Sequence, residues 1–108
     1  MQPRPAAPLA GHRWAARRLR RQLPDGTVVY LAPSREFPLV NLVMTFKGGS
    51  SLDPADLPGL ASMTARLVRE GGAEGLSPAE FDETLDFLAT EVAVNANDTF
   101  TTATMNCR

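Results

Sequence analysis

The side chains best suited to metal or nucleophilic chemistry are scarce in this sequence. His12 is its one histidine and Cys107 its one cysteine. A zinc site built on paired histidines or on several cysteines therefore cannot form within the chain, nor can an internal disulfide. No second histidine is available to activate the thiol, so we interpret Cys107 as an inert strand residue. The sequence accordingly predicts no metal and no cofactor.

Charge is distributed unevenly along the chain. Residues 1–22 hold six arginines and no acidic residue, which leaves five basic and 12 acidic residues in the remainder. We interpret residues 1–16, which contain three prolines and Gly11, as a flexible basic leader. An Arg-rich targeting segment and a nucleic-acid patch are the alternatives. Trp14 is the only aromatic residue near these arginines, so we expect no nucleic-acid partner.

Hydropathy argues against insertion into a membrane. No stretch approaches the roughly 18 apolar residues that a spanning helix needs. The N-terminus also lacks the apolar run of a secretory signal. We expect a soluble protein, with the cytoplasm and the periplasm both left open.

Two regions near the front of the chain read as strands. Pro24, Asp25 and Gly26 predict a turn between the arms of a hairpin that begins near Arg17. Residues 39–47 have a period of two in which one face is wholly apolar (Val40, Leu42, Met44 and Phe46). That period of two is typical of a strand whose one face covers a core.

Helical periodicity follows. Pro58 suits the first turn of a helix, and an apolar stripe is expected to be buried: Leu60, Met63, Thr64, Leu67 and Val68. The opposite face, with Ser62, Arg66 and Arg69, is expected to project away from the core. Arg66 is interpreted as a surface side chain near Glu70. Gly71 and Gly72 end this helix.

A second helix and two more strands complete the pattern. Ser77 and Glu80 form a predicted capping box, with Pro78 at the first helical position. Phe81, Leu85 and Leu88 mark its apolar stripe. Val92, Val94 and Ala96 then alternate, residues 97–98 turn, and residues 99–105 form a last strand. The order predicts an α+β fold, an antiparallel sheet with helices packed on one face.

Several short segments, in this order and spacing, carry a resemblance. They are Leu-Pro-Asp-Gly at 23–26, Pro-Leu-Val at 38–40, Gly-Ser-Ser-Leu-Asp-Pro at 49–54, Pro-Gly-Leu-Ala at 58–61, and Asn-Asp-Thr at 97–99. Residues 17–108 thereby resemble the N-terminal part of an insulinase/pitrilysin metallopeptidase domain. Ala89 departs from the family, which usually has glycine at the close of the second helix. The resemblance implies a longer domain than this sequence covers, so a truncated chain is expected.

Active members of that family carry an H-x-x-E-H zinc motif on the helix that follows Gly-Leu-Ala. The aligned positions here are Ser62, Ala65 and Arg66. A hydroxyl, a methyl group and a permanent cation cannot replace two imidazoles and a carboxylate. The resemblance therefore implies a degenerate motif with neither catalytic nor metal-binding residues.

The function that the resemblance implies is that of a non-catalytic subunit or domain in proteolysis. It would bind unfolded peptide substrate and complete the chamber of a zinc-bearing insulinase-like subunit or domain. The alternative is a structural or assembly subunit with no role in peptide cleavage. A third hypothesis, a protease active by itself, predicts zinc bound to the purified chain.

Overall fold

A computed structural model describes residues 19–108, and the predicted leader at 1–16 lies outside them. The chain divides into two units, Met1–Phe37 and Pro38–Arg108, each described by itself. In the first unit, β1 (Leu19–Gln22) pairs antiparallel with β2 (Val28–Leu31). The turn between them places Gly26 at φ 88°, and Asp25 Oδ1 accepts a hydrogen bond from the Thr27 N–H at 2.9 Å. The predicted hairpin is confirmed.

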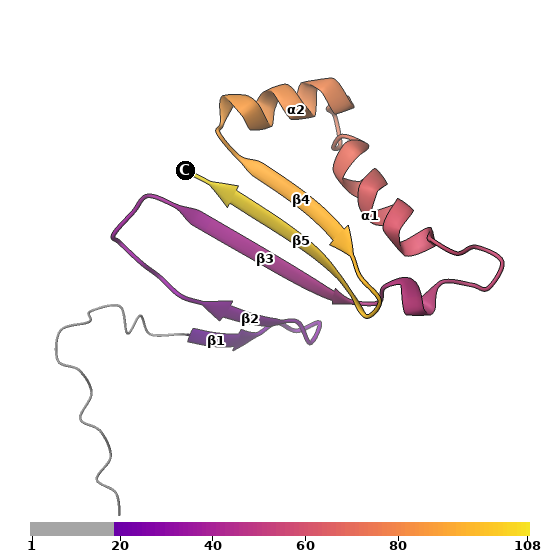
Figure 1. The fold of residues 1–108 in the computed structure, drawn as a ribbon. Coiled ribbons are helices and arrows are strands. Elements are labelled where there is room, and N and C mark those ends of the chain that lie inside the picture. The colour runs from indigo at the N-terminus through magenta and orange to yellow at the C-terminus, as the bar shows by residue number, and fades with distance from the viewer. Residues whose placement is uncertain (1–18) are drawn as a thin grey trace, which may run out of the picture. The chain divides into compact units, whose positions relative to one another are not determined.

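The second unit is a three-stranded antiparallel sheet with two helices (Figure 1). Its elements are β3 (Val40–Lys47), the 3-10 turn η1 (Ser50–Leu52), α1 (Leu60–Glu70), α2 (Pro78–Phe87), β4 (Glu91–Ala96) and β5 (Phe100–Cys107). The strand order is β3-β5-β4, so the strand that comes last in the chain is central. The predicted α+β class is confirmed.

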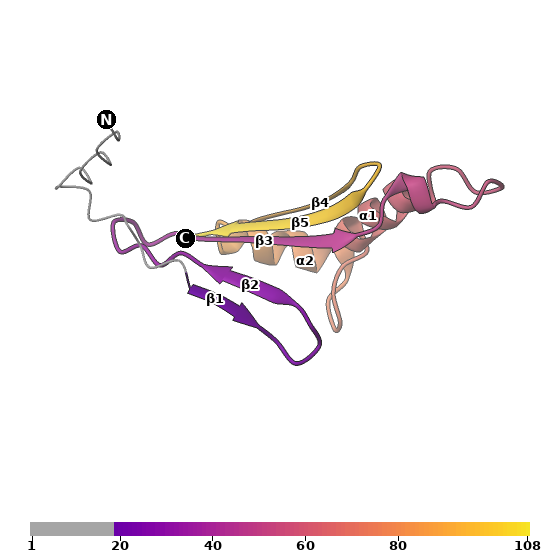
Figure 2. The same cartoon turned by 90° about the horizontal axis from the view of Figure 1, so that it is seen from below.

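Register puts unlike side chains on the two faces of this sheet. Leu42 lies opposite Met105, and Met105 lies opposite Val92, so these three share one face. Both helices lie on one side of the sheet, next to β4 (Figure 2). On the other face, which is largely polar, Asn106 lies opposite both Asn41 and Glu91.

The packed core of this unit is small. The buried apolar side chains are Ala65 on α1 and Leu85 on α2. Both helices contact β4 rather than β3, and Met44 in β3 remains 47% exposed. Much of the apolar face of the sheet is therefore open among the described residues.

The predicted stripe on α1 is wrong. Met63 and Leu67 are 65% and 60% exposed, and Leu60 and Val68 are also exposed. The helix instead turns its small side chains, Ala61 and Ala65, toward the sheet. Small residues four apart let a helix backbone approach a strand closely, and here that approach decided the rotation of the helix. Pro58 also precedes the helix, whose N-cap is Gly59.

The predicted start of α2 is confirmed. Ser77 Oγ accepts from the Glu80 N–H, and Glu80 Oε2 accepts from the Ser77 N–H at 2.9 Å. Hydrogen bonds from the Ser77 side chain, and then from its backbone, hold the pKa of Glu80 below its usual value. Of the predicted stripe, Leu85 is buried and Phe81 is half-buried, whereas Leu88 is exposed.

Helix α2 ends in a left-handed turn at an alanine. Thr90 N–H donates to Leu85 O at 2.9 Å and Ala89 N–H donates to Asp86 O at 3.1 Å, the two bonds of a Schellman motif. Ala89 takes φ 47°, the one positive φ of a non-glycine residue between 19 and 108. This is the position at which the resembled family usually has glycine.

We expect Ala89→Gly to stabilise the protein by about 1 kcal/mol, because glycine adopts positive φ without the clash of a Cβ atom. Urea denaturation followed by circular dichroism would measure the gain. Ala79→Gly, in the first turn of α2, is the matched control and should cost about 0.5–1 kcal/mol. Equal losses from both substitutions would contradict the assignment of strain to Ala89.

Candidate functional site

Helix α1 carries Ser62, Ala65 and Arg66, and its first N–H groups are bound by the carboxylate of Asp53, from the loop before the helix. The N-cap, Gly59, has no side chain with which to accept from the first free N–H groups. Asp53 does this instead: Oδ2 accepts from Gly59 N–H and Oδ1 from Ala61 N–H, each at 2.9 Å. Its negative charge also suits the N-terminal end of a helix. The Asp53 carboxylate thus fixes where α1 begins.

The loop before Asp53 is docked on the turn between β4 and β5. Ser50 N–H donates to Asn97 O at 2.9 Å, and Ser51 N–H donates to Asp98 O at 3.0 Å. The Ser50 hydroxyl also donates to Asp98 Oδ1 at 2.8 Å. Two segments that carried the resemblance, 49–54 and 97–99, therefore bind each other and place α1 beside β4.

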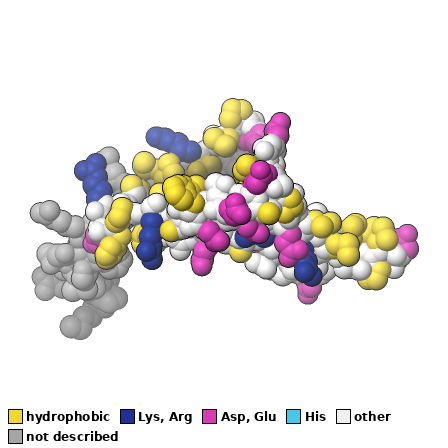
Figure 3. All heavy atoms as spheres, turned by 90° about the horizontal axis from the view of Figure 1, so that it is seen from above, with side chains coloured by type: hydrophobic (Ala, Val, Ile, Leu, Met, Phe, Trp, Pro, Cys, Tyr) yellow, Lys and Arg dark blue, Asp and Glu magenta, His cyan; other side chains and the backbone are white. Residues whose placement is uncertain are grey.

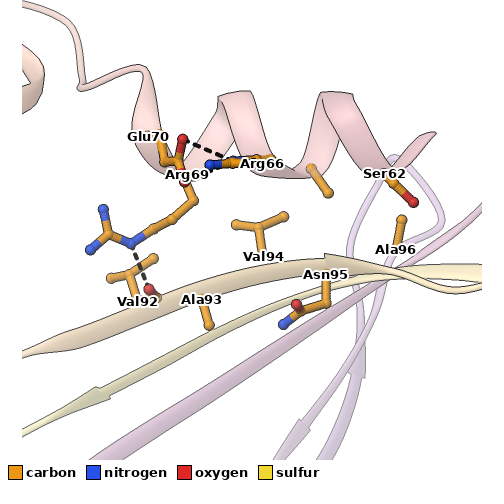
Figure 4. A pocket seen from close by; sticks show the side chains of 10 residues that line it. Ser62, Arg66, Arg69, Glu70, Val92, Ala93, Val94, Asn95 and Ala96 are labelled. Atoms are coloured by element: carbon orange, nitrogen blue, oxygen red, sulfur yellow. Dashed lines mark hydrogen bonds and ion pairs between the residues drawn. The ribbon is translucent and has the colours of Figure 1, made fainter. Parts of the chain in front are cut away.

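The structure brings Ser62, Ala65 and Arg66 together. All three line a hollow of about 440 Å³ between α1 and β4 (Figure 4). Residues 92–96 of β4 form its floor. Ala65 is 3% exposed against the sheet, whereas Ser62 and Arg66 stand on the wall of the hollow.

Arg66 lies against Glu70, as predicted. Its Nε lies 3.0 Å from Oε1 and 3.1 Å from Oε2 of that carboxylate. The two side chains are 75% and 56% exposed, so solvent screens the pair and its contribution is about 0.3–0.5 kcal/mol. Glu70 therefore places a carboxylate beside Arg66 on the wall of the hollow, while the guanidinium keeps its positive charge.

These residues do not fit zinc. The hollow offers a serine hydroxyl, a methyl group and a guanidinium where an inverted zinc motif needs two imidazoles and a carboxylate. Arg66 has no lone pair to donate, and its charge repels a divalent cation. No group of three potential metal ligands occurs within the part of the chain described, residues 19–108.

The floor of the hollow is a free strand edge. β4 pairs with β5 on one side, and no strand of residues 19–108 pairs with its other side. Asn97 N–H donates to Phe100 O, so Asn97 forms a hydrogen-bonded pair with β5. In the observed register the backbone N–H and C=O groups of Asn95 and Ala93 therefore also point toward β5. Because alternate residues of an antiparallel strand point to opposite sides, the backbone groups of Val92, Val94 and Ala96 point outward.

Arg69 does not lie where its position on the helix predicts. It was expected to project away from the core, yet its Nε donates to Val92 O at 2.7 Å and its Nη1 to Asp82 Oδ1 at 2.8 Å. The guanidinium also lies 5.8 Å from the centre of the Phe81 ring. The spacing of small residues at 61 and 65 was the available signal, because Arg69 continues that same face of α1.

A second hollow, of about 500 Å³, lies on the other side of α1. Leu60, Thr64 and Val68 line it together with Phe46 and Leu52. Three members of the predicted stripe therefore border an open apolar groove over the sheet instead of a closed core.

No family model and no curated protein matches this chain. Its functional assignment therefore depends on the residues and their geometry. Cys107 lies in β5 as expected, with Sγ 3.8 Å from Val40 O. None of the helices between residues 19 and 108 is long and apolar enough to cross a membrane.

The surface around α2 is acidic. Residues 70–107 include eight acidic residues and no lysine or arginine. Two of the eight, Glu70 and Asp82, are paired with arginines of α1. Acidic side chains gather on the helical side of this unit (Figure 3). This side of the unit therefore attracts positively charged groups.

Proposed function

We propose that this chain is a zinc-free insulinase-like domain that binds unfolded peptide and completes the chamber of a zinc-bearing partner. The observation that carries the proposal is the hollow between α1 and the free edge of β4. It is lined by Ser62, Ala65 and Arg66, the positions at which an active member would hold two zinc-binding histidines and the glutamate that acts as general base. A peptide bound there would lie where the family performs its chemistry, but the chemistry itself must come from the partner.

The edge of β4 suits an extended peptide of varied sequence. Val94 and Ala96 present outward N–H and C=O groups that no described residue pairs with. A peptide that adds as a strand satisfies these groups through its own main chain, which is the same in every sequence. The hollow leaves room for its side chains beside α1. Binding of this kind selects unfolded segments over folded proteins.

Two further features support kinship with the insulinase family. The segments that carry the resemblance contact one another through Ser50, Ser51, Asn97 and Asp98, as parts of one structural unit would. Ala89 has the backbone conformation for which the family's glycine is suited. The segments that carry the resemblance thus also have structural roles that fit it.

Val94→Pro tests the proposal. Proline removes the outward N–H of Val94 and places its ring on the edge, while the bonds between β4 and β5 stay intact. We expect binding of a fluorescent peptide of alternating threonine and valine, with lysine at both ends, to weaken by about tenfold or more. Fluorescence anisotropy with the full chain would measure this.

Val94→Ala is the control, because it shortens the side chain but keeps the N–H. Equal affinity of Val94→Pro and Val94→Ala for the peptide would overturn binding at this edge. A chain that assembles with a zinc-bearing insulinase-like subunit, yet neither binds peptide nor changes cleavage by that subunit, would support the structural-subunit alternative instead.

A further inference from the structure

Arg69 occupies one end of the free edge of β4. Its Nε donates to the outward carbonyl of Val92 at 2.7 Å, inside the hollow that the edge lines (Figure 4). The side chain is held at two other points, by Asp82 at 2.8 Å and by the ring of Phe81 at 5.8 Å. With 29% of its side chain exposed, it is the less exposed arginine of α1.

We propose that Arg69 sets the register of a bound peptide by closing the edge at Val92, so that a peptide strand pairs with Val94 and Ala96 only. This inference rests on the proposed function, since it concerns the same edge. Arg69 would be a positioning residue: it contacts the strand that binds the peptide and not the site of any bond cleavage.

The hydrogen-bonding pattern of paired strands supports the restriction of a peptide to Val94 and Ala96. A residue in a hydrogen-bonded pair exchanges two bonds with its partner, one through its N–H and one through its C=O. At Val92 the guanidinium lies 2.7 Å from the C=O and occupies the outward side from which a peptide strand would approach, so it hinders pairing there. At Val94 and Ala96 both groups are open on that side within the described residues. β4 then ends at Ala96, which closes the window at its other end.

The guanidinium is well suited to act as a stop. Its planar fork donates to Val92 O and to the Asp82 carboxylate at the same time, which one ammonium group does less well. Because Asp82 balances its charge, Arg69 would end the pairing through geometry and hydrogen bonding and would not capture an acidic peptide residue.

Amide hydrogen exchange on the full, ¹⁵N-labelled chain, with and without the unlabelled peptide described above, tests the register. In the wild-type chain we expect the peptide to slow exchange at Val94 and Ala96 and to leave Val92 unchanged. In Arg69→Met, which keeps an apolar stem beside Phe81, exchange at Val92 should also slow, by about tenfold or more, and the peptide should bind more tightly. Arg69→Lys should restore much of the wild-type pattern.

The two hypotheses fail separately in this experiment. Absence of protection at Val94 and Ala96 in the wild type would overturn peptide binding at the edge. Protection at those residues together with Val92 in the wild type, or no gain at Val92 in Arg69→Met, would overturn the role of Arg69 alone. Unchanged exchange at Thr102 and Thr104 of β5 shows that a variant is folded. If Arg69→Met does not fold, the wild-type pattern decides the question, because protection of Val92 by the peptide would still overturn the role of Arg69.

Discussion

Gly49→Ala is expected to lower the free energy of unfolding by about 2–3 kcal/mol. Gly49 is buried, and a Cβ atom there would collide with the carbonyl oxygen of Asn97 and lie 2.8 Å from the carbonyl carbon of Asp98. Both neighbours are backbone atoms in the turn between β4 and β5, so neither can swing aside as a flexible side chain would. The loop would have to lift off the turn and give up the backbone bonds of Ser50 and Ser51.

Denaturant unfolding would measure this effect as a lower transition midpoint with little change in slope. Ser50→Ala is the matched control, because it removes the bond from the hydroxyl to Asp98 and leaves the backbone contacts in place. That variant should cost only about 0.5–1.5 kcal/mol. If Gly49→Ala were no more destabilising than Ser50→Ala, the close approach of the loop to the turn would be wrong.

Asp53→Ala should destabilise the protein by about 1–2 kcal/mol, because two N–H groups at the start of α1 would lose their acceptor. The helix carries one wall of the hollow, so fraying at Gly59 would also disturb Ser62. We therefore expect the loss of stability to be accompanied by weaker peptide binding. Thermal unfolding and fluorescence anisotropy on the same samples would measure the two effects.

Asp56→Ala is the control for this prediction. Asp56 lies in the same exposed loop, and its removal should change stability by less than about 0.5 kcal/mol. Asp53→Asn should fall between the two variants, because the amide oxygen retains one of the two acceptors. Equal stability of Asp53→Ala and Asp56→Ala would show that the carboxylate does not cap α1.

Local signals in the sequence predicted the elements well. The strand at residues 39–47 is confirmed, although the four side chains of its apolar face stay exposed, and so are the turn around Gly26 and the capping box of Ser77 and Glu80. These features depend on contacts between residues close in the chain, so the sequence carries them directly. The surface pairing of Arg66 with Glu70 follows from the same helical spacing.

Features that depend on long-range packing could not be predicted. The predicted rotation of α1 was wrong. Hydrophobicity favoured Met63 and Leu67 as the residues that face the sheet, whereas close approach to β4 favoured Ala61 and Ala65. Whether β4 or β3 lies beside α1 depends on the order of strands, which no local pattern contains. The bond from Arg69 to the free edge of β4 is a consequence of both.

The order β3-β5-β4 has a consequence for how the chain reaches its fold. β3 and β4 do not pair with each other, so neither can join a sheet until β5 has emerged and inserted between them. Val40 meets Cys107 in this register, so closure of the sheet spans most of the unit. Contacts so distant in sequence slow the search for the native state, and we expect folding in milliseconds to seconds, with the helices formed first. During that interval the apolar face of β3 is open to any chaperone that recognises extended hydrophobic segments.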